Sequence, residues 1–262
     1  MRTEELRYGD LALQRGELRV PIESTPRPVV VLVHGGYWRT GFTRAAMVPI
    51  SDDLTRLGYA TWNLDYRTID DGGGWPGTPA DVAAGIDHLA KVGAANNLAL
   101  DRVVFLGHSA GAQLMMWAAS RDGQDGQPPA AVLPKGLVSL SGVLDLERAS
   151  IGGAGELATL GDSTRAFLGG SPAQQPDRYR SASPVQLVPY GVPTLLIHGS
   201  KDARVPPEHS RSFTDAATRA GDSPTYVELP NADHFDVIRV DRRWWDEVIR
   251  WLPSVIGSPL QS

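Results

Sequence analysis

The pentapeptide GHSAG at residues 107–111 matches the pattern Gly-x-Ser-x-Gly. In this pattern a serine nucleophile occupies a sharp turn between a strand and a helix. A pattern this short also arises by chance in a chain with 28 glycines, so its context decides. The apolar run VVFL precedes it and the helix-compatible run AQLMMWAA follows it, as the turn requires. Ser109 is therefore predicted to be a nucleophile.

Of the six histidines, His234 is the best placed to activate Ser109. A serine hydroxyl needs a base within hydrogen-bond reach. His234 lies in the turn NADHF after the last predicted strand, at the end of the chain order serine, acid, histidine. The other five are expected to be structural. We expect His34 to brace the glycine loop, His88 to lie in mid-helix and His108 to stand beside the serine. His198 is expected to lie in a buried strand, and His209 on the solvated surface near a helix start.

The acid that orients the base is predicted to be Asp202. It follows the apolar run TLLIHGS, 93 residues after Ser109 and 32 before His234. This position places it at the same sheet edge as both of them. Asp145 remains an alternative acid, because it also follows a predicted strand; its structural alternative is to cap the next helix.

A glycine-rich loop, HGGYW at residues 34–38, follows the first long apolar strand. A tetrahedral intermediate needs backbone N–H groups aimed at its oxyanion, and this is where such a loop supplies them. The expected donors are the amides of Gly36, Tyr37 and Ala110. The structural alternative is that the glycines only close a turn between a strand and a helix.

Apolar runs that alternate with stretches of helical period predict one α/β domain with a mostly parallel sheet and helices on both faces. The strands are expected at residues 29–35, 59–65, 102–109, 136–142, 194–200 and 225–231. Helices are expected at 43–57, 79–92, 110–119, 207–220 and 235–252, and an antiparallel edge hairpin within 6–20. The long segment 144–192 is predicted to be a small cap inserted into the single domain 1–262.

The composition favours a small-molecule substrate. The chain has 30 acidic and 25 basic residues, a formal charge of −5, which does not favour nucleic acid or an anionic membrane as a partner. No cysteine is present and no histidine cluster has metal-ligand spacing, so we expect no metal and no cofactor. No signal peptide or long apolar run is seen, which predicts a cytoplasmic protein. The edge hairpin leaves room for a homodimer.

Several motifs together resemble the kynurenine formamidase (arylformamidase) branch of the α/β-hydrolases: HGGYW, LDYR, GHSAGAQL, GSKDARVP and DHFDVI. The related hormone-sensitive-lipase-like esterases usually carry HGGG where this chain has HGGY, which favours the formamidase branch. Two features differ: Gln113 stands where formamidases often have histidine, and Tyr66-Arg67 followed by Trp75-Pro76 resembles the esterase pattern.

The resemblance implies an α/β-hydrolase fold and hydrolysis of an aryl formamide such as N-formylkynurenine, a step of tryptophan catabolism, through a formyl-enzyme on Ser109. Tyr37 and Trp38 would then wall the pocket or stack on the aromatic leaving group; alternatively, Trp38 packs under the cap. Two other functions remain open: a short-acyl carboxylesterase with the same triad, and a non-catalytic ligand-binding relative of the fold.

Overall fold

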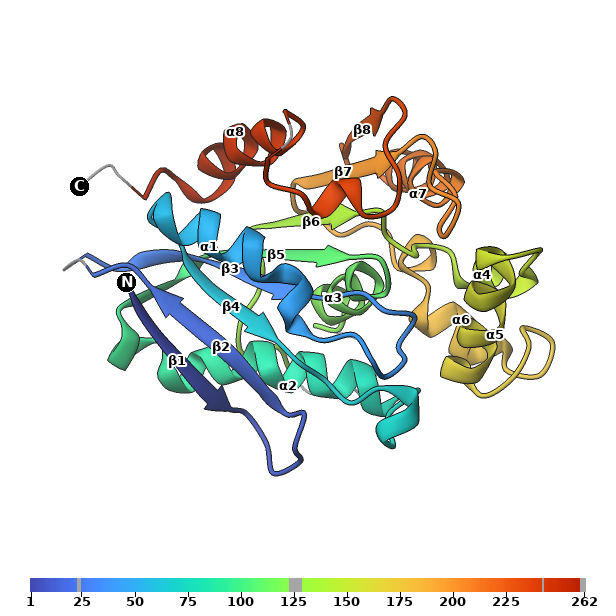
Figure 1. The fold of residues 1–262 in the computed structure, drawn as a ribbon, viewed down its shortest axis with the longest axis horizontal. Coiled ribbons are helices and arrows are strands. Elements are labelled where there is room, and N and C mark those ends of the chain that lie inside the picture. Colours follow the sequence, from blue (N-terminus) through green and yellow to red (C-terminus); the bar gives the residue numbers. More distant parts are fainter. Residues whose placement is uncertain (23–24, 123–128, 242, 260–262) are drawn as a thin grey trace.

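The central strands of the sheet of this protein are buried on both faces. The computed structural model describes residues 1–22, 25–122, 129–241 and 243–259. Within them, eight strands form one sheet in the order β1-β2-β4-β3-β5-β6-β7-β8 (Figure 1). The strands are β1 (Arg2–Arg7), β2 (Arg15–Val20), β3 (Arg27–Val33), β4 (Ala60–Leu64), β5 (Leu98–His108), β6 (Gly136–Leu140), β7 (Thr194–Gly199) and β8 (Thr225–Leu229).

The six predicted parallel strands and the edge hairpin are confirmed. β3 to β8 pair in parallel, with Val31 opposite Trp62 on β4 and Phe105 on β5. β1 and β2 pair antiparallel at the edge, and β2 pairs antiparallel with β4. The side chains of a strand alternate between the two faces. Val29, Val31 and Val33 therefore enter one apolar core and Val30 and Leu32 the other.

Helices cover both faces of the sheet. α1 (Val48–Arg56) and α8 (Trp245–Ile256) pack on the face of Val30, and α2 (Gly77–Val92), α3 (Ala110–Ser120) and α7 (Glu208–Arg219) pack on the other. Figure 1 shows α1 and α8 above the strands and α2 below them. Because both faces are covered, β3 can be buried at every position and apolar from Pro28 to Val33.

The segment 144–192, called the insertion below, leaves the sheet after β6 and returns at β7. It carries α4 (Leu146–Ile151), α5 (Glu156–Leu168) and α6 (Pro176–Ala182). In Figure 1 these helices lie at the right, beyond the ends toward which β5 and β6 point. The carboxyl edge of a parallel sheet is where open α/β folds bind ligands. The insertion is thus placed beside that edge.

The helix expected at 235–252 is wrong in its first half. Only a short 3₁₀ turn, η5 (Asp236–Ile238), forms there, and α8 begins at Trp245; Arg242 lies outside the described residues. The carboxylate of Asp233 accepts the amide protons of Phe235 and Asp236, which closes a local turn that competes with a helix. Val237 is nevertheless fully buried, so the apolar spacing reflected core packing.

No helix in the described ranges is long and apolar enough to cross a membrane.

Candidate active site

Ser109 stands on the turn that joins β5 to α3. Its backbone has φ 55° and ψ −121°, a conformation with positive φ that side chains normally avoid. The Ser109 amide donates to the carbonyl of Leu140, and the Ser109 carbonyl accepts from Val143, so the neighbouring strand end holds the turn on both sides. The predicted turn around the nucleophile is therefore present.

The glycine of the motif that follows the serine is required by close backbone packing. A Cβ on Gly111 would lie 2.2 Å from the carbonyl oxygen of Val33 and 2.3 Å from that of His34. Real Cβ contacts do not reach such distances, so any other residue would push α3 away from β3. The same contact joins the Ser109 turn to the start of the glycine loop.

His234 and Asp202 form a buried pair. Nδ1–H of His234 donates to Oδ2 of Asp202 over 2.7 Å, and both side chains are almost fully buried. Oδ1 of Asp202 accepts from the amides of Arg204 and Val205, each at 2.9 Å. Because Nδ1 of His234 carries the proton in this pair, Nε2 is left free to accept one.

The environment of Asp202 keeps it ionised. Burial raises the pKa of its carboxyl, but hydrogen bonds from His198, His234 and the Val205 amide outweigh burial and hold the pKa well below its ordinary value. Nε2 of His198 lies 3.3 Å from Oδ2 of Asp202 and 2.8 Å from the carbonyl oxygen of Val205. His198 is thus a buried partner of the acid.

One small cavity brings Ser109 and His234 together. Ser109 and His234 both line it, with a volume of about 30 Å³. Its remaining wall comes from the glycine loop, the segment before α1, the residue before Ser109, the loop after β7 and the loop that carries His234: Gly35, Gly36, Tyr37, Phe42, Ala46, His108, Arg204, Phe235 and Ile238. Phe42 and Phe235 are each 40% exposed, so they form an apolar rim.

The glycine loop passes directly against Ser109. A Cβ on Gly35 would lie 2.8 Å from Cβ of Ser109. Gly36 has φ 122°, and Tyr37 and Trp38 both have φ 56°. Within the described residues, the amides of Gly36, Tyr37 and Ala110 have no hydrogen-bond partner in the protein. Ala110 is also the first residue of α3, where amides are oriented to bind negative charge.

The side chain of Tyr37 is held by an ion pair. Its hydroxyl donates to Oε2 of Glu156 (3.0 Å) and accepts from Nη1 of Arg204 (3.2 Å), and Arg204 and Glu156 lie 2.6 Å apart. Burial raises the pKa of Tyr37 to about 12, so the hydroxyl stays protonated. The Arg204 guanidinium also lies 5.0 Å over the ring of Phe235.

Trp38 does not reach the cavity. It is fully buried, its ring stacks on Phe167 at 4.6 Å and 7°, and its Nε1–H donates to Oε1 of Gln113 at 3.0 Å. Gln113 in turn donates to the carbonyl of Ala182 in α6. Of the two aromatic residues expected to contact substrate, only Tyr37 lines the cavity. The structure gives Trp38 the alternative place, packed under the insertion.

The expectation that His209 is solvated is wrong. It is 1% exposed, it accepts a hydrogen bond from the amide of Asp145, and burial lowers its pKa to about 3. Asp145 caps α4 by accepting the amide of Arg148, as its structural alternative predicted. His34 also fills its predicted place, because its Nδ1–H donates to the carbonyl of Gly35.

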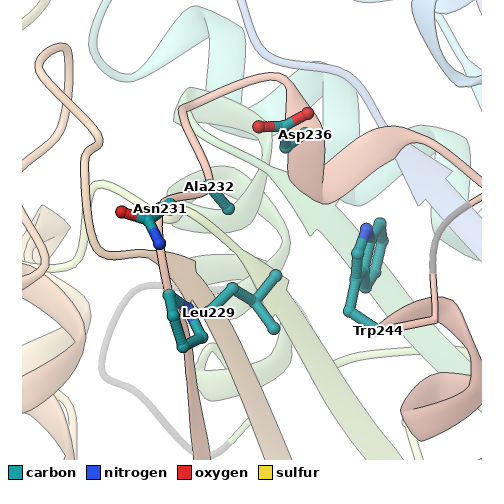
Figure 2. Close-up of a pocket in the computed structure, with 6 residues that line it drawn as sticks. Leu229, Asn231, Ala232, Asp236 and Trp244 are labelled. Carbon is teal, nitrogen blue, oxygen red and sulfur yellow. The ribbon is translucent and has the colours of Figure 1, made fainter.

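A second and larger hollow lies apart from the cavity that Ser109 and His234 line. Its volume is about 290 Å³, and Figure 2 shows Leu229, Asn231, Ala232, Asp236 and Trp244 around it. Neither Ser109, Asp202 nor His234 lines it. Across the described chain, no group of three or more histidine and carboxylate side chains is arranged to hold a metal ion.

Glu156 and Arg204 were not predicted from the sequence to belong to the site. Arg204 follows Asp202 by two residues, and this closeness to the acid was a usable signal. Glu156 lies in an insertion without a recognisable motif. It is 119 residues from Tyr37 in the sequence, and only the folded structure brings the two side chains together.

Known proteins resemble this chain over most of its length. Residues 18–216 match the model of the BD-FAE family. The chain is 30% identical to esterase LipC of Mycobacterium tuberculosis over 248 residues, which cover 88% of this chain and 59% of LipC. It thus spans about three fifths of that relative's length.

Solved structures share the fold. A truncated carbohydrate esterase from gut microbiota superposes with a TM-score of 0.82 at 20% identity, covering 97% of this chain and 96% of that one. Esterase B from Lactobacillus Rhamnosis superposes with a TM-score of 0.82 at 21% identity, covering 97% and 85%. The predicted α/β-hydrolase fold is confirmed by both. The chain belongs to the BD-FAE family and has the α/β-hydrolase fold.

Proposed function

We propose that this protein is a carboxylesterase that cleaves short-acyl esters, with Ser109 as nucleophile, His234 as general base and Asp202 as the acid that orients it. One observation carries the proposal. Ser109 and His234 line the same small cavity, and His234 is tied through Nδ1 to the ionised Asp202. A serine beside a histidine with a free Nε2 is the arrangement that acyl transfer requires.

In the first half of the reaction, Oγ of Ser109 attacks the ester carbonyl carbon while Nε2 of His234 takes the hydroxyl proton. The tetrahedral intermediate collapses as the bond to the alcohol oxygen breaks, and the protonated His234 gives its proton to the leaving alcohol. Water then attacks the acyl-enzyme with His234 again as base, and the acid product and free Ser109 are released.

The developing oxyanion is assigned to the amides of Tyr37 and Ala110, with Gly36 as a further donor. Support comes from their lack of protein partners within the described residues and from the contact of the glycine loop with Ser109. Preorganised donors of this kind typically contribute a factor of about 10²–10³ each to kcat.

The size of the cavity favours a small acyl group. Its volume is about 30 Å³, and Ser109 and His234 both line it. A formyl or acetyl group suits such a space better than a long acyl chain. The alcohol part of the ester would then lie outward, along the exposed rim of Phe42 and Phe235. We propose that the insertion acts as the cap over this edge, since Glu156 at the start of α5 reaches Tyr37.

Esters are favoured over aryl formamides as substrates by the comparisons. The relatives reported above carry esterase names, and Tyr37, the residue behind the formamidase resemblance, makes contacts that do not depend on a formamide. A formyl group would also fit the cavity, so aryl-formamide hydrolysis stays a prediction that the same assay tests.

The test is kcat/KM on p-nitrophenyl acetate and on N-formylkynurenine, measured side by side for the wild type and Ser109→Ala. Efficient ester cleavage that disappears in the variant supports the proposal. A preference of several decades for the formamide would instead make the protein an arylformamidase. No activity on either compound, with Ser109 unreactive toward a fluorophosphonate, would favour a non-catalytic ligand-binding protein.

A further inference from the structure

Two adjacent residues of the glycine loop are held in an unfavourable backbone conformation. Tyr37 and Trp38 both have φ 56°. For bulky residues this left-handed region costs about 1 kcal/mol or more each. Such a conformation persists only when surrounding contacts hold it. The contacts that hold these two side chains therefore decide where the amide of Tyr37 points.

Trp38 is held at one end of α5. Phe167, the residue before the last of that helix, stacks on its ring at 4.6 Å, and the carbonyl of Phe167 accepts the amide proton of Trp75. The hydrogen bond from Trp38 to Gln113 ties the ring to α3 as well. Trp38 is thus clamped between the insertion and the helix that follows the nucleophile.

Tyr37 is held at the other end of the same helix. Glu156 is the first residue of α5, and its carboxylate accepts the Tyr37 hydroxyl proton at 3.0 Å. Arg204 bonds both groups, while its own backbone amide donates to Asp202. Glu156 itself is not among the residues that line the cavity.

We propose that α5 of the insertion positions the oxyanion hole, and that Glu156 is a positioning residue that acts through the Tyr37 hydroxyl. This inference rests on the proposed function of the site. The first and last turns of one helix hold the two strained residues of the loop, so that the Tyr37 amide faces Ser109. Through Arg204, the same contacts join the oxyanion loop to the loop of Asp202.

The consequence for the reaction is specific. If Glu156 no longer holds the hydroxyl, Tyr37 can relax toward negative φ, and its peptide rotates away from the oxyanion position. The triad itself keeps its contacts, since His234 and Asp202 bond each other and not Glu156. Stabilisation of the tetrahedral species should therefore fall, while binding of the ground-state ester changes little.

The experiment compares the variants Glu156→Ala, Glu156→Gln, Tyr37→Phe and the double variant Glu156→Ala/Tyr37→Phe. The matched control is Asp162→Ala, which removes an exposed carboxylate from the same helix; Asp162 pairs with Arg165 and does not line the cavity. For each protein we measure kcat and KM on p-nitrophenyl acetate, the thermal midpoint, and the inhibition constant of phenylboronic acid, which forms a tetrahedral adduct with an active-site serine.

We expect kcat to fall by about 10- to 100-fold in Glu156→Ala and in Tyr37→Phe, a factor typical of a misplaced oxyanion donor. KM should change little, and the boronic acid should bind more weakly by the same factor as kcat. The double variant should be no worse than the poorer single one, because both changes remove one interaction. Glu156→Gln keeps an acceptor for the hydroxyl and should recover part of kcat, and Asp162→Ala should match the wild type.

Wild-type kcat and boronate affinity in Glu156→Ala would overturn the inference. So would losses that multiply in the double variant, or a lower thermal midpoint with unchanged kcat, which a purely structural contact would give. The rate at which a fluorophosphonate labels Ser109 gives a readout independent of the substrate. If the wild type labels but cleaves no ester, the proposed function fails while the labelling rates of the variants still test α5. If the wild type does not label, both fail.

Discussion

Two strained turns meet at the cavity, and they are held in different ways. The Ser109 turn is fixed by backbone close to it: Gly111 packs against the carbonyl of Val33, and Ser109 bonds the end of β6. The glycine loop at Tyr37 and Trp38 is fixed by side chains from distant parts of the chain, chiefly α5. A turn held by local backbone leaves a short sequence motif. A turn held by distant side chains leaves none.

The largest effect should follow from the Ser109 hydroxyl itself. Ser109→Ala should lower kcat on an ester by about 10⁶-fold, the scale seen when a triad serine is removed. Circular dichroism and the urea midpoint should stay close to those of the wild type, because the side chain is small. Substantial activity left in this variant would place the nucleophile elsewhere.

The backbone packing of the Ser109 turn is tested by Gly111→Ala. The new Cβ would lie 2.2 Å from a backbone oxygen, so α3 or β3 must move, at a cost of about 3 kcal/mol or more in the free energy of unfolding. The control is Gly77→Ala at the start of α2, where the nearest atom is 3.8 Å away. This change should be neutral or stabilise by up to about 1 kcal/mol. Equal urea midpoints for the two variants would contradict the conclusion that close backbone packing fixes the Ser109 turn.

Acid should weaken the Ser109 turn through His108, the residue beside the nucleophile. Burial, and then the charge of His234, lower the His108 pKa to about 3 from 6.5. The unfolded chain therefore takes up a proton below pH 6.5 that the folded chain refuses, and stability falls as pH drops from 6.5 toward 3. By pH 5 this amounts to about 2 kcal/mol for one such histidine.

His108→Gln isolates that contribution. Glutamine can still donate an N–H to the carbonyl of His234, the bond that Nε2 of His108 makes, but it does not titrate. Urea unfolding between pH 7.5 and 5 should show a shallower loss of stability in the variant. His34 and His209 are also buried with lowered pKa and should keep part of the slope. An unchanged slope would mean that His108 does not resist protonation.

The smallest predicted effect is the change in the free energy of unfolding when glycine is introduced, and it should have opposite signs at the two turns. Ser109→Gly should raise the free energy of unfolding by about 1 kcal/mol relative to Ser109→Ala, because glycine relieves the positive φ and few contacts are lost. Tyr37→Gly relieves a similar φ but removes a ring that is packed in the apolar core and that Tyr37→Phe keeps, so it should lower stability relative to Tyr37→Phe. The same sign at both positions would remove the distinction.

The sequence predicted what depends on local pattern. The six parallel strands, the edge hairpin and the Ser109 turn follow from apolar runs and a five-residue motif. The chain order of serine, acid and histidine led to the prediction of Asp202 and His234, which are hydrogen-bonded to each other in the structure. Periodicity misplaced the start of α8, because Asp233 closes a turn and Val237 is buried without being helical.

Contacts between distant segments could not be predicted in this way. His209 looked exposed from its place on α7, but the entry to the insertion covers it. Trp38 looked available to a substrate, but Phe167 and Gln113 enclose it. A single sequence carries no signal for such pairings, since they depend on how an insertion folds back on the sheet.

The contacts of α5 with Tyr37 and Trp38 also limit how the insertion could be exchanged for another. An insertion exchanged for that of another family member would have to bring a carboxylate at the start of its helix and a stacking ring one residue before its end. Without both, the grafted enzyme would keep its triad and lose its oxyanion site. On the proposal that α5 positions the oxyanion loop, the glycine loop and the insertion of this protein would have to be transferred together.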